Sequence, residues 1–306
     1  MALLKPPATL DEQVEILKSR GLIIDDVQLA KEILAKTNYY RLVNAYSLDL
    51  YDNSPGVKPK TKYKDGVSLN QLYDIYQFDT KLRHILFELI EPFELKFRTS
   101  LAYYLAHKYC ATAYLRPEIY FKHEYYESFL ADLEREKTVQ QRSLIIQHHN
   151  YMYNGVLPVW AMVEIISFGT ISKLYKNLNP KALRDIASLY HTYPNLLSSW
   201  LNAFVSVRNI CAHYGRLYNA SLLARPMIPK NGPQLDETKI FSVIYLLFKL
   251  NNDSLLKLSL YYRLVNAVVT HSRIELPRIG FPENWMDLLC GSIGLPPEDI
   301  STFQKE

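Results

Sequence analysis

An arginine, an asparagine and a histidine interrupt an apolar helical pattern in the segment VRNICAHYGRLYN, residues 207–219. Arg208, Asn209 and His213 lie there within a span of six residues. The preceding segment has the i, i+3, i+4 spacing of a buried helical stripe, carried by Leu196, Leu197, Trp200, Leu201, Phe204 and Val205. Charged and polar groups are costly to bury without partners, so the three are either bonded within the structure or retained for chemistry.

The side chains of this motif suit chemistry on a phosphodiester. Asn209 and His213 are four residues apart and share a helix face, whereas Arg208 lies about 140° from His213 around an ideal helix. Arginine can hold phosphate oxygens through its planar fork, and histidine readily exchanges a proton near neutral pH. Cleavage of RNA by its own 2′-hydroxyl needs a base, an acid and positive charge, without a metal ion. The structural alternative is a helix end where Arg208 pairs with a carboxylate and His213 bonds to the backbone.

One chain supplies one such motif, in which a single histidine would have to serve as both base and acid. A symmetric dimer that joined two motifs would supply two histidines and two arginines, enough for both roles. We therefore expect a homodimer with the site at its interface. Within one chain, loosening of the helix near Gly215 would help the long side chain of Arg208 to turn toward His213.

The longest helical pattern in the chain must position this motif. It follows Ser68, which forms a capping-box pattern with Gln71. Its apolar stripe consists of Leu72, Ile75, Tyr76, Leu82, Ile85, Leu86, Leu89 and Ile90. Pro92 lacks the N–H group that an internal helical hydrogen bond needs, so the sequence predicts a kink near Glu91 in place of one straight rod.

Charged residues on the same helix have two interpretations. Asp79 and Arg83 are four residues apart, as are Glu94 and Arg98, and this spacing favours structural ion pairs, Asp79–Arg83 and Glu91–Glu94–Arg98. Alternatively, Arg83 or Arg98 could approach a bound phosphate from a helix beside the motif. We therefore keep these two arginines as secondary candidates for RNA binding.

The residues that follow the histidine are further candidates. Arg216 could bind an RNA phosphate, and the ring of Tyr214 or Tyr218 could stack on an unpaired base. The chain has 24 tyrosines, most of which must pack in the core or at its boundary. Arg142 and His148 form a second Arg–His pair, but no Asn follows Arg142, and we interpret the pair as part of a surface helix.

The N-terminal region indicates short helices with defined caps. Thr9 and Glu12 form a capping-box pattern that opens a helix, and Gly21 can close it. Asp25 or Asp26 can cap the next helix, whose inward-facing residues would be Val27, Ala30, Ile33 and Leu34. The aromatic segment at 37–51 is ambiguous between helix and strand.

Residues 52–66, DNSPGVKPKTKYKDG, are the clearest loop. Lysines occupy every second position from Lys58 to Lys64, either as an exposed, mobile charge run or as an arm that touches phosphates. Beyond the long helix, the patterns predict helices at about 123–148, 158–178, 181–190, 194–213, 236–250 and 253–272. The chain is thus expected to be almost wholly α-helical, a bundle with helical additions at both ends.

Composition excludes several classes of protein. The 306 residues are 48% hydrophobic and 22% charged, an ordinary globular balance, and the net charge of +4 permits an acidic partner without demanding one. The three cysteines lie far apart with no CxxC pair, and there is no HExxH motif, phosphate-binding loop or GxGxxG, so we expect no metal and no cofactor. No secretory signal is evident, and the most apolar run, at 240–250, is too short to span a bilayer. We expect a soluble, cytoplasmic protein.

Several blocks of the chain, in order, resemble one known family. The segment RNICAHYGRLYN resembles the R-N-x-x-x-H signature of HEPN-domain ribonucleases, as carried by bacterial abortive-infection (Abi, AbiD/AbiF-like) phage-resistance proteins. The other similar blocks are KPPATLDEQVEILKSRGLIIDD, TNYYRLVNAY, YQFDTKLRHILFELIEPFELKFRTSLAYYLAHKY and LPVWAMVEIISFGTISKLYKNL. The similarity covers roughly residues 5–225.

This resemblance implies an all-α HEPN fold and a metal-independent endoribonuclease with a toxin-like role that halts the host during phage infection. It gives Arg208 and His213 catalytic roles and Asn209 a supporting polar role. It also implies distant kinship with the RNA-guided type VI CRISPR effectors. The organisation would be an N-terminal helical extension with a basic loop at 1–66, a HEPN-like core at 67–225 and a C-terminal helical extension at 226–306.

The implied partners are an RNA substrate, a second copy of the chain and a small RNA or protein that acts as an antitoxin. Two alternatives stay open. The chain could be a HEPN module that binds RNA or protein without turnover. It could also be a helical scaffold, which would require Arg208 and His213 to be buried in satisfied ion pairs.

Overall fold

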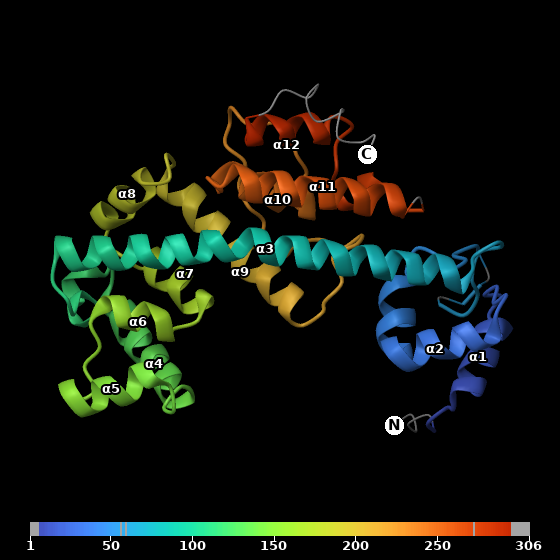
Figure 1. The fold of residues 1–306 in the computed structure, drawn as a ribbon, viewed down its shortest axis with the longest axis horizontal. Coiled ribbons are helices and arrows are strands. Elements are labelled where there is room, and N and C mark those ends of the chain that lie inside the picture. The colour runs from blue at the N-terminus through green and yellow to red at the C-terminus, as the bar shows by residue number, and fades with distance from the viewer. Residues whose placement is uncertain (1–5, 56, 59, 272, 295–306) are drawn as a thin grey trace.

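The described part of the chain is an all-α protein. The computed structural model describes residues 6–55, 57–58, 60–271 and 273–294, and these residues form helices joined by loops, with isolated β-bridges and no strand (Figure 1). The α-helices are α1 (Leu10–Ser19), α2 (Val27–Thr37), α3 (Leu69–Lys108), α4 (His123–Val139), α5 (Leu144–Tyr153), α6 (Val159–Ile165), α7 (Phe168–Lys176), α8 (Pro180–Ser188), α9 (Pro194–Ala212), α10 (Ile240–Leu250), α11 (Ser254–Thr270) and α12 (Trp285–Ile293). Short helical turns lie at Tyr40–Asn44, Ala113–Leu115, Pro117–Ile119 and Leu276–Ile279. Among the described residues, every helix is too short or too polar to span a lipid bilayer.

Helix α3 is the axis of the molecule. It is 40 residues long and begins after Ser68, whose side chain accepts a hydrogen bond from the Gln71 N–H group, as its capping pattern predicts. Figure 1 shows α9 crossing its middle and α10–α12 along one side. Its buried side chains pack against α6, α9, α10 and α11, and among those with almost no exposure are Phe78, Leu82, Leu86, Leu89, Phe97, Leu101 and Leu105. This stripe joins the parts of the fold into one core.

Pro92, where the sequence predicts a kink, does not interrupt α3. The helix continues through Pro92 and appears as one gently curved rod in Figure 1. Pro92 cannot donate to the Glu88 carbonyl, but Ile90 and Phe93 on either side of it are buried, at 1% and 4% exposure. Packing of both halves against the same core holds the rod together, because separating them would expose that apolar surface.

The N-terminal caps agree with the sequence. Thr9 and Glu12 form the predicted capping box of α1, and the Asp26 side chain caps α2 by accepting from the Leu29 N–H group. Of the residues predicted to face inward from α2, Ala30, Ile33 and Leu34 are buried. Val27 was predicted to be buried as well, but it lies in the first turn and is 39% exposed. The ambiguous segment that follows forms a helical turn of the π type at Tyr40–Asn44.

Two of the predicted helices are divided in the structure. The helix expected at 123–148 becomes α4 and α5, and the helix expected at 158–178 becomes α6 and α7. In both cases a serine caps the second helix: Ser143 accepts from the Ile146 N–H group and Ser167 from that of Thr170. A serine hydroxyl competes for backbone N–H groups and stabilises a helix start, a signal that apolar periodicity alone overlooks.

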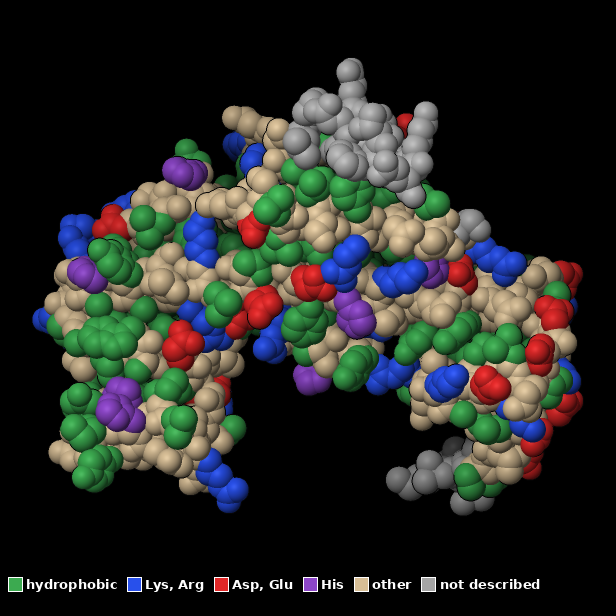
Figure 2. Space-filling model, in the orientation of Figure 1, with side chains coloured by type: hydrophobic (Ala, Val, Ile, Leu, Met, Phe, Trp, Pro, Cys, Tyr) green, Lys and Arg blue, Asp and Glu red, His purple; other side chains and the backbone are tan. Residues whose placement is uncertain are grey.

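The molecule has one open side. Figure 1 shows α1 and α2 near one end of α3 and α4–α6 near the other, with both groups projecting to the same side of α3. In the space-filling view of Figure 2 the region between these two lobes is hollowed. The C-terminal end of α9 lies in the middle of this side, between the lobes (Figure 1).

Candidate active site

Helix α9 carries the motif at its C-terminal end. Of the predicted apolar stripe, Trp200 is 4% exposed and Leu197, Leu201 and Phe204 are 0% exposed, whereas Leu196 and Val205 are half-buried against the core. The helix stays regular through Ala212, and the His213 N–H group caps it by donating to the Asn209 carbonyl at 3.0 Å. The motif is therefore presented by a rigid element anchored in the core.

A tight turn ends α9 immediately after the histidine. Tyr214 has a left-handed backbone conformation with φ of 57°, and its N–H group donates to the Cys211 carbonyl at 3.1 Å. The Gly215 N–H group donates to the Ile210 carbonyl at 2.7 Å, which completes a Schellman motif. A Cβ atom on Gly215 would lie 2.9 Å from Cγ2 of Ile210, so this close approach requires glycine.

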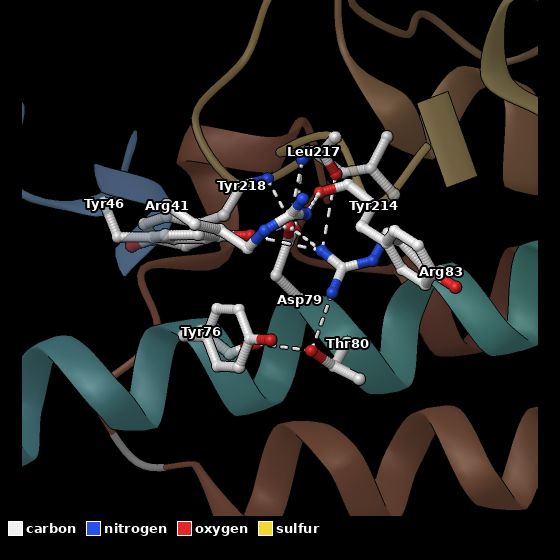
Figure 3. A network of polar contacts seen from close by, with 10 residues as sticks. Arg41, Tyr46, Tyr76, Asp79, Thr80, Arg83, Tyr214, Leu217 and Tyr218 are labelled. Carbon is white, nitrogen blue, oxygen red and sulfur yellow. Dashed lines mark hydrogen bonds and ion pairs between the residues drawn. The ribbon is translucent and has the colours of Figure 1, made fainter. Parts of the chain in front are cut away.

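The carboxylate of Asp79 holds the segment that follows the turn. It accepts hydrogen bonds from the Tyr218 N–H group at 2.7 Å and from the Leu217 N–H group at 3.1 and 3.2 Å. It also accepts from the hydroxyl of Tyr46 at 2.7 Å and from Arg83 at 2.8 Å (Figure 3). Burial raises the pKa of Asp79, and the hydrogen bonds from these donors oppose that shift. Asp79 thus ties α3 to both the N-terminal lobe and the end of α9.

Arg83 completes this network and has a positioning role. Its guanidinium is 3% exposed, pairs with Asp79 and donates to the Gly215 carbonyl at 3.3 Å and to the Thr80 hydroxyl at 2.7 Å. The predicted Asp79–Arg83 ion pair is confirmed. With its N–H groups engaged and almost no exposed surface, Arg83 is poorly placed to bind an RNA phosphate.

Arg98 has a similar positioning role farther along α3. It is 8% exposed, forms the predicted ion pair with Glu94, and donates to the carbonyl of Ile166 at 2.8 Å and to that of Val163. These carbonyls lie at the C-terminal end of α6, just before α7. Arg98 therefore fixes the α6–α7 junction, and we leave it out of the site proposed below.

The side chains of the three motif residues are more exposed than those of Asp79, Arg83 and Arg98. Asn209 and His213 are exposed, and Arg208 is half-buried. Within the described residues, none of the three side chains has a hydrogen bond or an ion pair. The structural alternative, in which Arg208 pairs with a carboxylate and His213 bonds to the backbone, is therefore not what the structure contains.

Arg208 borders a groove on α3. The groove has a volume of about 290 Å³, and its other lining residues are Phe87, Glu88, Ile90, Glu91, Glu94 and Leu95. Its three carboxylates give the groove an acidic character beside the arginine. Because α9 does not loosen before His213, Arg208 and His213 stay on different helix faces, about 140° apart on the ideal geometry.

The two candidates for RNA binding that follow the histidine, Arg216 and Tyr218, differ in whether their side chains are available. Tyr218 is 5% exposed, its ring packs edge-on against Phe78, and its hydroxyl accepts from the Glu275 N–H group at 3.2 Å. A ring packed in this way offers no face to a nucleobase. Arg216 is half-buried and its side chain has no bonding partner among the described residues, so it stays a candidate for phosphate binding.

Sequence reasoning missed Arg41, which lies beside the motif. Its guanidinium donates to the Tyr214 carbonyl at 2.8 Å and lies 5.4 Å from the centre of the Tyr214 ring (Figure 3). The two residues are 173 positions apart, so no local pattern could pair them. The one available signal was that Arg41 belongs to the TNYYRLVNAY block, which resembles the family's sequence.

The motif segment also contains the thiol of Cys211. Burial raises the pKa of the Cys211 thiol, within the motif, to about 12, so this thiol stays protonated and is a poor nucleophile near neutral pH. The described residues contain no group of three or more His, Cys, Asp and Glu side chains that could hold a metal ion.

The other Arg–His pair lies apart from the motif, with Arg142 just before α5 and His148 exposed on that helix.

A comparison with protein families covers all of the sequence blocks quoted above except the first, which precedes the matched range. The model of one family, described as Abi-like protein, matches residues 32–219. This range covers more than half of the chain and includes α3, the Asp79–Arg83 network and the motif at the end of α9. No match was found among curated proteins or among solved structures. The chain belongs to the Abi-like protein family.

Proposed function

We propose that this protein is a metal-independent endoribonuclease of HEPN type that acts in abortive-infection phage defence. Membership of the Abi-like family supports the defence role. The observation that carries the ribonuclease assignment is the state of the motif. The side chains of Arg208, Asn209 and His213 have no bonding partner among the described residues, whereas Arg83 and Arg98 on α3 form buried ion pairs. Partnerless polar groups on a rigid helix end are available to a substrate.

The proposed reaction is cleavage of RNA by its own 2′-hydroxyl. A histidine takes the proton of the 2′-hydroxyl, whose oxygen attacks the adjacent phosphorus. The bond from phosphorus to the 5′-oxygen breaks, and that oxygen receives a proton from a second histidine. The products are a 2′,3′-cyclic phosphate and a 5′-hydroxyl. Arg208 would stabilise the additional negative charge of the transition state, and Asn209 would orient the phosphate.

A second copy of the chain would complete the site. In one chain, Arg208 lines the groove on α3, whereas His213 is the C-cap residue of α9 and is not among the residues that line this groove. Two motifs related by a twofold axis would supply both histidines. Each arginine would then stabilise the transition-state charge beside the histidine of the other copy. The end of α9 lies in the middle of the hollowed side, where an approaching copy or an RNA strand can reach it (Figures 1 and 2).

The test is cleavage of total cellular RNA and of a labelled single-stranded oligoribonucleotide in the presence of EDTA. Wild type should yield fragments that end in 2′,3′-cyclic phosphate. His213→Ala and Arg208→Ala should each lower the rate by about 100-fold or more, since each removes a proton-transfer or charge-stabilising group. Arg142→Ala and His148→Ala, which alter the other Arg–His pair, are matched controls and should keep the wild-type rate.

The folding of each variant is checked by circular dichroism and its size by gel filtration. Cleavage that persists in both motif variants would contradict the assignment of the site. RNA that binds wild type but is never cut would instead favour a HEPN module that binds without turnover. In that case RNA that copurifies with the protein should be sequenced.

A further inference from the structure

We propose that Arg41 and Tyr214 form a platform on which one unpaired base of the RNA stacks beside the cut. This inference rests on the proposed function and names the form of its substrate, a single strand with an unstacked base next to the scissile phosphate. The platform joins two elements that are distant in the sequence. Arg41 comes from the turn after α2, and Tyr214 is the residue that follows His213.

The contacts between the two residues define the platform. The Arg41 guanidinium donates to the Tyr214 carbonyl at 2.8 Å and lies 5.4 Å from the centre of its ring, within cation–π distance. The ring nevertheless remains 66% exposed, and Arg41 is exposed as well. The remaining N–H groups of Arg41 have no partner among the described residues, so they can donate to a phosphate next to the stacked base.

The backbone gives an independent argument that the ring serves a purpose other than folding. Tyr214 occupies the left-handed position of the Schellman turn, where glycine is usual and a bulky residue is strained. The other non-glycine residues with positive φ among those described are Asn38, Asn154, Asn219, Lys60 and His191, of which three are asparagines. Asparagine tolerates this conformation, so the turn itself does not require tyrosine. An exposed ring also contributes little buried area to stability.

The chemistry of RNA recognition explains such a ring. Proteins that bind single-stranded RNA stack unpaired bases on exposed aromatic rings and on arginine planes. A base inside a duplex keeps both faces stacked and is not available to Tyr214. The buried Tyr218 cannot act in this way, whereas Tyr214 adjoins the proposed proton-transfer group directly. The platform therefore selects single strands and fixes the position of one nucleotide at the cut.

The experiment compares three variants on matched RNAs. Tyr214→Asn keeps a residue that accepts the turn but removes the ring, Tyr214→Phe keeps the ring, and Arg41→Ala removes the cation. The substrates are a labelled single-stranded oligoribonucleotide that wild type cuts and versions of it with an abasic nucleotide on either side of the cut. Thermal unfolding is the control for folding, and Tyr214→Asn should be no less stable than wild type.

Wild type should cut one of the abasic RNAs about 10-fold more slowly than the intact RNA, in line with the usual contribution of one stacked base. Tyr214→Asn should cut the intact RNA about 10-fold more slowly and show little further loss on that abasic RNA. Tyr214→Phe should keep the wild-type pattern. Arg41→Ala should cut the intact RNA at a rate between those of wild type and Tyr214→Asn. A well-folded Tyr214→Asn protein with the wild-type rate and the wild-type response to abasic RNA would overturn the platform.

A binding measurement separates this inference from the proposed function. Fluorescence anisotropy with a short labelled single-stranded RNA is measured for His213→Ala protein with and without Tyr214→Asn. Loss of the ring should weaken binding about 10-fold, and Tyr214→Phe should not. If wild type cuts no RNA but this loss is observed, the ribonuclease proposal fails and the platform stands. If binding does not change, the platform fails even when wild type cuts RNA.

Discussion

The carboxylate of Asp79 connects three parts of the chain at a point that solvent does not reach. Its partners are Tyr46 in the N-terminal lobe, Arg83 on α3 and the backbone of Leu217 and Tyr218 after the motif. A buried charge of this kind is tolerated because every partner is charged or donates a hydrogen bond. Asp79 and its partners hold the turn after α9, so the motif residues Arg208, Asn209 and His213 are not needed for that purpose.

Removal of this charge should be costly. Asp79→Asn leaves the Arg83 guanidinium buried without its counter-charge, and the free energy of unfolding should fall by about 3–5 kcal/mol. Urea denaturation measures the change. Glu15→Gln, which breaks the exposed Glu15–Lys18 pair, is the control and should cost less than about 1 kcal/mol. Equal effects of the two substitutions would show that the Asp79 network does not hold the turn.

Among the elements, α3 shows how packing overrides a local preference. Pro92 stands inside the helix, where it deprives the Glu88 carbonyl of its helical donor. Glu88 and Glu91, three residues apart, line the groove beside Arg208. The helix tolerates the proline because its other face is held in the core along its full length.

Pro92→Ala should therefore stabilise the protein. The new N–H group can donate to the Glu88 carbonyl without a change of fold, and the free energy of unfolding should rise by about 1–3 kcal/mol. Thermal unfolding followed by circular dichroism checks this. Pro180, at the first position of α8, is the matched control, because a proline there suits the helix start and its replacement should bring no gain. A lower melting temperature for Pro92→Ala would mean that the proline ring itself contributes to packing.

At the scale of the whole molecule, the open side determines what can reach the motif. The C-terminal helices α10–α12 lie on a different side of α3 (Figure 1), and the residues Ile240–Phe248 of α10 are all buried. The described part of the C-terminal extension therefore supports the core. The lobes on the open side leave the end of α9 accessible, and the N-terminal lobe contacts it through Arg41.

A composite site between two copies predicts rescue between inactive variants. Arg208→Ala and His213→Ala, each inactive alone, should regain part of the wild-type RNA cleavage when they are coexpressed as mixed dimers. In the mixed dimer one arginine still lies beside the histidine of the other copy, whereas neither single-variant dimer keeps such a pair, so the rate should exceed that of either variant. The missing second histidine should keep the rate below wild type. Cleavage of a labelled RNA by the purified mixed dimer measures this. A site formed within one chain would show no rescue, although both proteins were folded and mixed.

The sequence by itself determined the features that depend on neighbours along the chain. The apolar period predicted α9 and its buried face, the caps of α1 and α2 followed from Thr9 and Asp26, and the spacing of i, i+4 predicted the ion pairs of Arg83 and Arg98. Residues three or four apart are brought together by the helix itself. The motif of Arg208, Asn209 and His213 could be located for the same reason, as a polar interruption of a regular pattern.

Only the tertiary structure decided which of the candidate side chains are free. Arg83 and Tyr218 suit RNA binding by their types, yet contacts with distant residues such as Gly215 and Glu275 engage them inside the fold. Arg41 reaches Tyr214 across 173 positions, and α3 continues through its proline because a shared core covers both halves. Such contacts depend on the packing of whole helices, which no short stretch of sequence encodes.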